Sequence, residues 1–348
     1  MCLRNYTRWF LLCISLSLGI AASAETPIVV KVVVVAMYEQ GADTGDAPGE
    51  FQFWVEREHL DKILAFPAGY HDLRMNDKGV LGILTGVGTA KATASIMALG
   101  LDSRFDLTHA YWVVAGIAGG NPANVSLGSA VWAHWVVDGD LAHEIDAREI
   151  PPDWPTGYVP LRKSTPYEQP MNASLGQVYE LNMSLVEWAF QLTKDIPLPD
   201  NATMREMRSR FNQPVAKKPP FVFVGDDMCA STFWHGVRMD AWANAWVSYY
   251  TEGKGNFAVT GMEDTGTLQS LKFLAQAGKV DWNRILVLRT VSNYDQPPPG
   301  VSPWDNLAAE KAGKYSAFQP ALESAYAVGH VVVDKLVEDW AHTRNQVP

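Results

Sequence analysis

A run of β-branched residues near the start of the chain constrains its fold more than any other feature. Residues 28–36 read IVVKVVVVA, with one charged side chain among nine. Successive side chains of a strand point to opposite faces of its sheet, so a strand that is apolar on both faces must be covered on both. Such strands are typical of α/β proteins, in which helices cover the sheet. The run therefore predicts an α/β fold.

Other patterns along the chain extend this prediction. Apolar runs predict strands at residues 80–84, 111–115, 129–138, 221–224, 257–260 and 285–291, and helical spacing predicts helices at 91–101, 174–194, 267–277 and 316–342. This alternation predicts a mixed, mostly parallel central sheet flanked by helices. Since 47% of the 348 residues are hydrophobic, the chain can build one large core. We expect a single domain over residues 25–348, with a proline-rich excursion at about 150–220.

The first 24 residues have the pattern of a signal peptide. Two arginines precede an apolar run from Trp9 to Ile20, and Ala22-Ser23-Ala24 forms an A-x-A cleavage site. The apolar run is shorter than a membrane span needs, which disfavours the alternative of an uncleaved anchor helix. The sequence therefore predicts export to the periplasm or the extracellular space. Without another long apolar run, the mature chain is not expected to span a membrane.

Charge and cysteine content exclude several kinds of partner. A formal net charge of −10 argues against nucleic acid, which prefers a basic surface. Cys2 and Cys13 lie within the predicted signal, which leaves Cys229 without a disulfide partner. The histidines and this cysteine show no metal-ligand spacing, so we expect no metal cofactor. A small neutral or cationic ligand fits the composition better.

Two polar clusters follow predicted strands and mark a candidate ligand site. Glu263 and Asp264 stand between the strand at 257–260 and the helix after it, and the strand at 285–291 ends in Ser292-Asn293-Tyr294-Asp295. Open α/β sheets bind ligands just beyond the carboxyl ends of their strands. The alternative is that the two acids only cap a helix. We expect both clusters to face one ligand.

These clusters resemble motifs of the nucleoside phosphorylase and nucleosidase superfamily. Together with the glycine-rich stretch Gly116–Pro122, they are most similar to the branch named purine nucleoside permeases. The resemblance covers the chain from about Ile28 to its C-terminal helix. It implies a nucleoside phosphorylase-like fold, a purine nucleoside as ligand, and a homo-oligomer whose subunits complete each other's sites.

The resemblance also implies roles for single residues. Glu263 would hold the ribose 2′,3′-diol, with Met262 packed beneath the sugar. The superfamily places its proton donor directly after Ser292, where this chain has Asn293, which cannot deliver a proton. Asp295, two residues later, is the other candidate acid. The sequence leaves the choice between Asn293 and Asp295 open.

Further residues of the expected site come from the other strand ends. A glutamate after the first strand activates water in nucleosidases, and Glu39 is the nearest match, although Gln40 also fits the register. Gly116 and Gly119 would let the backbone approach the ligand. Met228 and Cys229 would line the base pocket. Beyond them, Trp234 and His235 form a candidate aromatic wall, with a helix histidine bonded to its neighbour as the alternative for His235.

The same comparison bears on the co-substrate. Ile117 stands where phosphorylases carry a phosphate-binding serine, and no arginine occupies the Trp112–Val114 stretch where one is expected. Hydrolysis is therefore favoured, with phosphate kept as a candidate co-substrate and no other cofactor. The expected function is an exported purine nucleoside-binding protein that cleaves the N-glycosidic bond. The alternatives are a transport-linked binding protein without turnover, and a protein that acts on another nucleobase-containing ligand.

Overall fold

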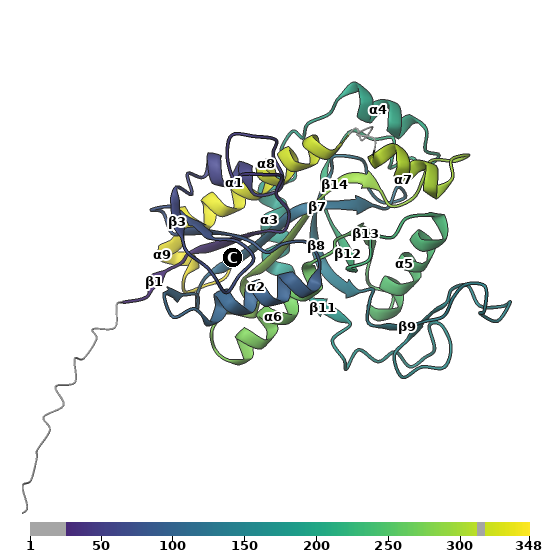
Figure 1. Cartoon of the computed structure of the whole chain (residues 1–348), viewed down its shortest axis with the longest axis horizontal. Helices are drawn as coiled ribbons and strands as arrows, with labels where there is room; N and C mark the ends of the chain where they lie inside the picture. The colour runs from purple at the N-terminus through teal and green to yellow at the C-terminus, as the bar shows by residue number, and fades with distance from the viewer. Residues whose placement is uncertain (1–25, 312–316) are drawn as a thin grey trace, which may run out of the picture.

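The computed structural model describes residues 26–311 and 317–348. The predicted signal peptide, with Cys2 and Cys13, therefore lies outside the described residues. Within them, most of the chain belongs to a large β-sheet and the helices that cover it (Figure 1).

The large sheet has ten strands drawn from the whole length of the chain. Their bounds are β2 (Val32–Ala36), β3 (Lys62–Leu64), β4 (Leu73–Met75), β5 (Val80–Leu84), β7 (Tyr111–Gly120), β8 (Ala130–Asp138), β11 (Val178–Glu180), β12 (Val222–Cys229), β13 (Phe257–Thr260) and β14 (Ile285–Tyr294). They lie in the order β11, β8, β12, β13, β7, β2, β5, β4 and β3, and β14 pairs with both β7 and β8. Two small sheets pair β1 (Ile28–Val29) with β6 (Phe105–Asp106), and β9 (Ala142–Glu144) with β10 (Tyr158–Pro160).

Part of the sheet closes into a barrel. Strands β8, β12, β13, β7 and β14 are hydrogen-bonded in turn, and β14 returns to β8. A closed ring needs an even number of antiparallel steps, and this one has two, between β13 and β7 and between β14 and β8. The predicted α/β fold is confirmed, but the sheet is mixed rather than mostly parallel. Parallel pairing holds together β5, β2, β7 and β14 at its centre.

The helices cover this sheet. Their bounds are α1 (Gln52–Arg57), α2 (Thr89–Leu101), α3 (Met183–Thr193), α4 (Ala202–Ser209), α5 (Val237–Tyr250), α6 (Asp264–Gln276), the 3₁₀ turn η1 (Trp282–Arg284), α7 (Pro303–Lys311), α8 (Phe318–Glu338) and α9 (Trp340–Thr343). Helices α2 and α6 pack side by side, whereas α8 packs on β7 and β14 (Figure 1). All five residues of β2 are fully buried, as the β-branched run predicted.

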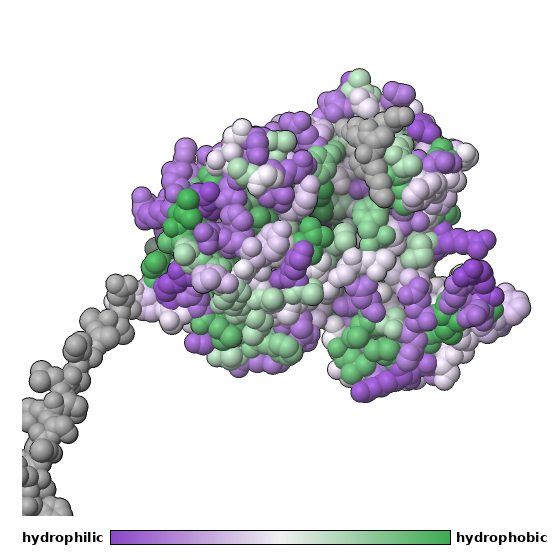
Figure 2. All heavy atoms as spheres, in the orientation of Figure 1, coloured by the Kyte–Doolittle hydropathy of each residue, from purple (hydrophilic) through white to green (hydrophobic). Residues whose placement is uncertain are grey.

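The surface gives no sign of a membrane-embedded belt on the face that Figure 2 shows. Hydrophobic residues form small separate groups there among hydrophilic ones (Figure 2). None of the helices in the described part of the chain combines the length and the apolar character needed to cross a bilayer.

Three predicted boundaries differ from the structure. The glycine-rich stretch 116–120, predicted as a loop, continues β7 because it pairs with β14 along its length. Strand β12 extends to Cys229 through Asp226 and Asp227, residue types that are usually rare in strands. Helix α3 begins only at Met183, since Gly176 at φ +88° and strand β11 come first. Through β11 the proline-rich region contributes to the main sheet.

Candidate functional site

A cavity of about 630 Å³ opens where β7, β13 and β14 end. Six of the predicted site residues line it together: Gly119, Met262, Glu263, Ser292, Asn293 and Asp295. They come from strands that are separated in sequence but neighbours in the barrel. The two polar clusters therefore face one space, as the sequence predicted.

Glu263 is held by hydrogen bonds that do not belong to helix capping. It occupies the N-cap position of α6, but its side chain makes no cap hydrogen bond. One carboxylate oxygen accepts the N–H of Gly88 at 3.1 Å, and the other accepts Nη2 of Arg289 at 3.0 Å. Gly88 has φ +94°, a conformation that glycine adopts without strain. The buried carboxylate is thus fixed at the cavity wall, and the simple capping alternative does not hold for it.

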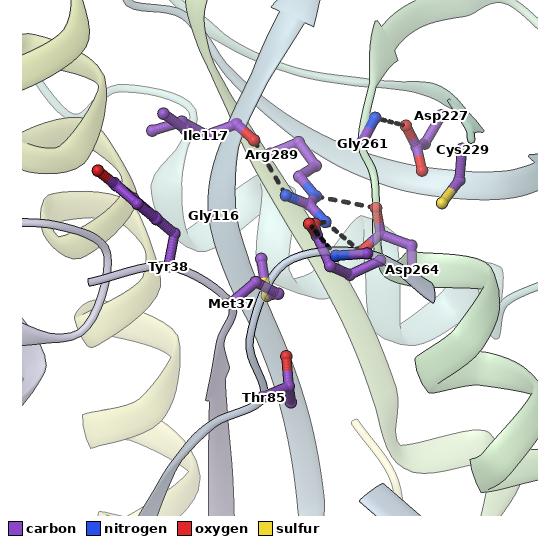
Figure 3. A network of polar contacts seen from close by, with 12 residues as sticks. Met37, Tyr38, Thr85, Gly116, Ile117, Asp227, Cys229, Gly261, Asp264 and Arg289 are labelled. Atoms are coloured by element: carbon purple, nitrogen blue, oxygen red, sulfur yellow. Dashed lines mark hydrogen bonds and ion pairs between the residues drawn. The ribbon is translucent and has the colours of Figure 1, made fainter. Parts of the chain in front are cut away.

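Arg289 lies at the centre of the polar network in Figure 3. Its guanidinium is buried and makes two hydrogen bonds of 2.9 Å to Asp264, and Nη1 donates to the carbonyl of Ile117 at 2.9 Å. A buried arginine is stable only when carboxylates and carbonyl groups satisfy it. The sequence analysis treated Arg289 as part of a strand. A charged residue inside an otherwise apolar run was the signal that could have identified it.

Glu50 is the second functional candidate that sequence reasoning missed. Its side chain is buried in the cavity wall and accepts the N–H groups of Met37 at 2.9 Å, Tyr38 at 3.1 Å and Ile117 at 2.8 Å. Burial raises its pKa to about 7, against the lowering effect of the positive charge of Arg289. A carboxylate with this pKa can take up a proton near neutral pH, as a general base must.

Gly116 provides the space that these side chains occupy. A β-carbon at this position would lie 2.6 Å from Oε1 of Glu50 and 2.9 Å from Nη1 of Arg289, closer than real side chains approach. Gly116 itself is not among the residues that line the cavity. Its predicted role at the ligand is therefore replaced by one in packing, whereas Gly119 reaches the cavity directly.

The structure does not place Glu39 in the cavity wall. Its carboxylate accepts the N–H groups of Phe51 at 2.9 Å and Gln52 at 2.6 Å, and also bonds Gly49 and Gln40. These contacts fold the loop after β2 so that Glu50 points inward. The glutamate after the first strand thus anchors the loop, and Glu50, eleven residues later, occupies the cavity.

Met228 and Cys229 are not among the cavity-lining residues either. Both are fully buried, because β12 continues through them. Sγ of Cys229 lies 3.4 Å from the backbone nitrogen of Thr265, behind the cavity wall. Thr232, Phe233 and Trp234 provide the wall that these two residues were expected to form.

His235 lies beside the wall and makes a local contact. Its Nε2 is 3.2 Å from the side-chain nitrogen of Asn306. Burial lowers the pKa of His235 to about 4, which leaves the imidazole neutral at neutral pH. Of the two residues predicted as an aromatic wall, Trp234 lines the cavity, and His235 bonds its neighbour.

Asn293 and Asp295 differ in what they can donate. The side-chain oxygen of Asn293 accepts the hydroxyl of Ser292 at 2.8 Å, and its amide donates to the carbonyl of Tyr294 at 3.1 Å. Asp295 is 1% exposed. Burial raises the pKa of Asp295 well above its usual range, and the nearby Asp240 carboxyl raises it further. Asp295 can therefore hold a proton at neutral pH, whereas Asn293 orients its neighbours.

One buried group of possible metal ligands lies behind the cavity. Carboxylate oxygens of Asp227 and Asp264 and Sγ of Cys229 lie within 4.8 Å of one another. The Arg289 guanidinium already engages both oxygens of Asp264, and Asp227 accepts the N–H of Gly261 at 2.7 Å. Since a cation there would compete with the guanidinium, we interpret this group as support for Arg289.

Solved structures with the same fold act on nucleosides. A 5′-methylthioadenosine/S-adenosylhomocysteine nucleosidase from Neisseria meningitidis, in complex with methylthio-immucillin-A, has a TM-score of 0.50 and 16% identity, over 90% of this chain and 99% of that one. The nucleosidase from Streptococcus pneumoniae has a TM-score of 0.51 and 14% identity, over 88% and 99%. At this identity the likeness establishes the fold.

Sequence relatives identify the family. A probable purine nucleoside permease from Schizosaccharomyces pombe is 31% identical over 269 residues, which are 74% of this chain and 76% of the relative. The purine nucleoside permease of Candida albicans is 32% identical over 264 residues, 74% of this chain and 64% of that protein. The model of one family, purine nucleoside permease, matches residues 29–348. The chain therefore belongs to the purine nucleoside permease family.

Proposed function

We propose that this protein binds a purine nucleoside in the cavity and hydrolyses its N-glycosidic bond. The observation that carries the proposal is the pair of carboxyl groups in one cavity. Glu50 has a pKa of about 7, and Asp295 has a pKa well above the usual range. Two carboxyl groups held in different protonation states are what acid–base cleavage requires. The family and the fold of the nucleosidases point to the same ligand.

The reaction makes two demands that these residues meet. Breaking the bond develops positive charge on the ribose and negative charge on the departing base. In our proposal Glu263 binds the ribose diol and stabilises its cationic character, with Met262 against the sugar. Glu50 takes a proton from the attacking water, and Asp295 donates one to the purine as it leaves.

Water fits the cavity better than phosphate does. Arg289 is the one cationic side chain among the described residues that line it, and three groups already engage this guanidinium. The N–H of Ile117 donates to Glu50. A phosphate ion would therefore meet the carboxylates of Glu50 and Glu263 without a free donor among these groups. This supports hydrolysis over phosphorolysis.

The second candidate function is binding without turnover, as in nucleoside uptake. It is favoured by the family to which the chain belongs and by Asn293, which stands at the position of the superfamily's acid. Here the cavity would hold the nucleoside through Glu263 and Asn293 and release it unchanged.

Product analysis separates these functions. The chain from residue 25 would be incubated with adenosine, inosine and guanosine, with and without phosphate, and the products resolved by chromatography. Free base with free ribose at equal rates under both conditions supports hydrolysis. Ribose 1-phosphate would show phosphorolysis instead, and intact nucleoside retained by the protein would show binding alone.

A further inference from the structure

A second carboxyl group lies next to Asp295, on a different element. Asp240 stands in the first turn of α5, and its side chain is hydrogen-bonded to that of Asp295. Neither oxygen of Asp295, nor Oδ1 of Asp240, has another hydrogen-bond partner in the described part of the chain. Two ionised carboxylates have no donor between them, so this contact requires one proton on the pair.

Hydrogen bonds place the negative charge of the pair on Asp240. Oδ2 of Asp240 accepts the side-chain amide of Asn244 at 3.2 Å. The Asn244 oxygen in turn accepts the amide of Asn121 at 3.1 Å, which orients the Asn244 amide toward Asp240. The first turn of a helix also favours an anion. Because these contacts stabilise ionised Asp240, the proton resides on Asp295.

Other titratable groups leave this pair undisturbed. His235, on the loop before α5, is neutral near pH 7, because burial lowers its pKa to about 4. Glu50, Glu263 and Arg289 also line the cavity, but their hydrogen bonds connect them to one another's surroundings rather than to Asp295. Asp240 is accordingly the charged side chain that acts on Asp295.

We propose that Asp240 is a positioning residue that shares one proton with Asp295 and keeps a neutral carboxylic acid in the cavity at neutral pH. The role in turnover rests on the proposed hydrolysis, whereas the shared proton does not. In turnover the proton of Asp295 moves to a ring nitrogen of the purine as the glycosidic bond breaks. Water adds to the ribose carbon and gives its proton to Glu50. Solvent then returns a proton to Asp295 and takes one from Glu50, so the cycle balances.

The second ionisation is what makes Asp295 a ready acid and a poor resting anion. Once it has donated its proton, two negative charges lie side by side in a buried place. This repulsion favours rapid reprotonation. It also predicts that the activity survives to a higher pH than an isolated buried aspartate would allow.

Infrared difference spectroscopy tests the shared proton without any substrate. Spectra would be recorded from about pH 5 to about pH 9 in the carbonyl-stretch region of protonated carboxyl groups. We expect a band at neutral pH that Asp295→Asn removes. In Asp240→Asn, where an amide can donate to Asp295, the midpoint of this band should fall by at least about one pH unit. Asp240→Glu keeps the charge and should retain the band.

Kinetics gives an independent reading. In Asp240→Asn the alkaline limb of kcat/KM should move down by the same interval, about tenfold in activity per pH unit. Asp146→Asn, in an exposed pair with Arg148, is the matched control and should leave both readings unchanged. Melting curves identify any variant that fails to fold, in which case Asp240→Glu and Asp295→Asn still decide.

The outcomes distinguish the two proposals. A band absent from the wild type, or an unchanged midpoint in Asp240→Asn, would overturn the shared proton. Turnover with an unchanged alkaline limb would do the same while the hydrolysis stands. A wild type that shows the band but releases no base would refute the hydrolysis and leave the shared proton intact.

Discussion

At the scale of single residues, the site depends on carboxyl groups whose surroundings differ. Glu50 is held by three backbone N–H groups and the charge of Arg289, whereas Asp295 is buried against another acid. The sequence pointed to Asp295 and Glu263, because both follow strands. It pointed to Glu39 rather than Glu50, because nothing local tells which glutamate of a loop turns inward.

The first prediction concerns Glu50 as the base. Glu50→Gln should lower kcat by about 10²- to 10⁴-fold, the usual contribution of a general base. In the wild type, activity should rise as the pH passes through about 7, since only ionised Glu50 accepts a proton. This acid limb should be absent from the residual activity of the variant. Steady-state kinetics across pH measures both effects.

Glu39→Gln provides the contrast. Because Glu39 holds the loop through backbone N–H groups, this variant should lower stability and raise KM but keep the acid limb near pH 7. If instead Glu39→Gln abolishes the limb and Glu50→Gln preserves it, the assignment of the base to Glu50 is wrong.

The second prediction concerns stability and pH. The pKa of Glu50 is raised by folding from 4.5 to about 7, so the folded state binds the proton more tightly than the unfolded state does. Its stabilising contribution is then complete below about pH 4.5 and is lost as the pH rises through about 7. The loss amounts to about 3 kcal/mol. Urea unfolding at a series of pH values should show the decline, and Glu50→Gln should flatten it.

At the scale of elements, apolar runs predicted the strands well and their ends less well. The runs at 257–260 and 285–291 became β13 and most of β14, and the polar residues after them reached the cavity. Strands β7 and β12 extend further than predicted, through glycines and aspartates. These residues have low strand propensity, and only pairing with distant neighbours holds them in the sheet. That error also explains why Met228 and Cys229 lie in the core.

The third prediction belongs to β7. Gly116→Ala would place a methyl group against Glu50 and Arg289, so one of them must move. We expect kcat/KM to fall at least about tenfold and stability to fall by about 1–3 kcal/mol, as overpacking usually costs. Kinetics and thermal melting measure the two effects. Wild-type activity in this variant would show that Gly116 is not required for the network.

At the scale of the whole molecule, closure of the barrel assembles the site. Strand β14 bridges β7 and β8, which brings Asn293 and Asp295 to the same cavity as Gly119 and Glu263. No local pattern reveals such pairings, since they join segments more than a hundred residues apart. The α/β class could therefore be predicted from the sequence, but the barrel and the partners Glu50, Arg289 and Asp240 could not.

The most direct test of this account compares binding with turnover in three proteins. Wild type, Glu50→Gln and Asp295→Asn would each be titrated with inosine by calorimetry and assayed for release of free base. The account predicts similar affinities in all three and a loss of turnover of at least about 10²-fold in each variant. Wild-type rates of base release in either variant, or no release by the wild type, would contradict it.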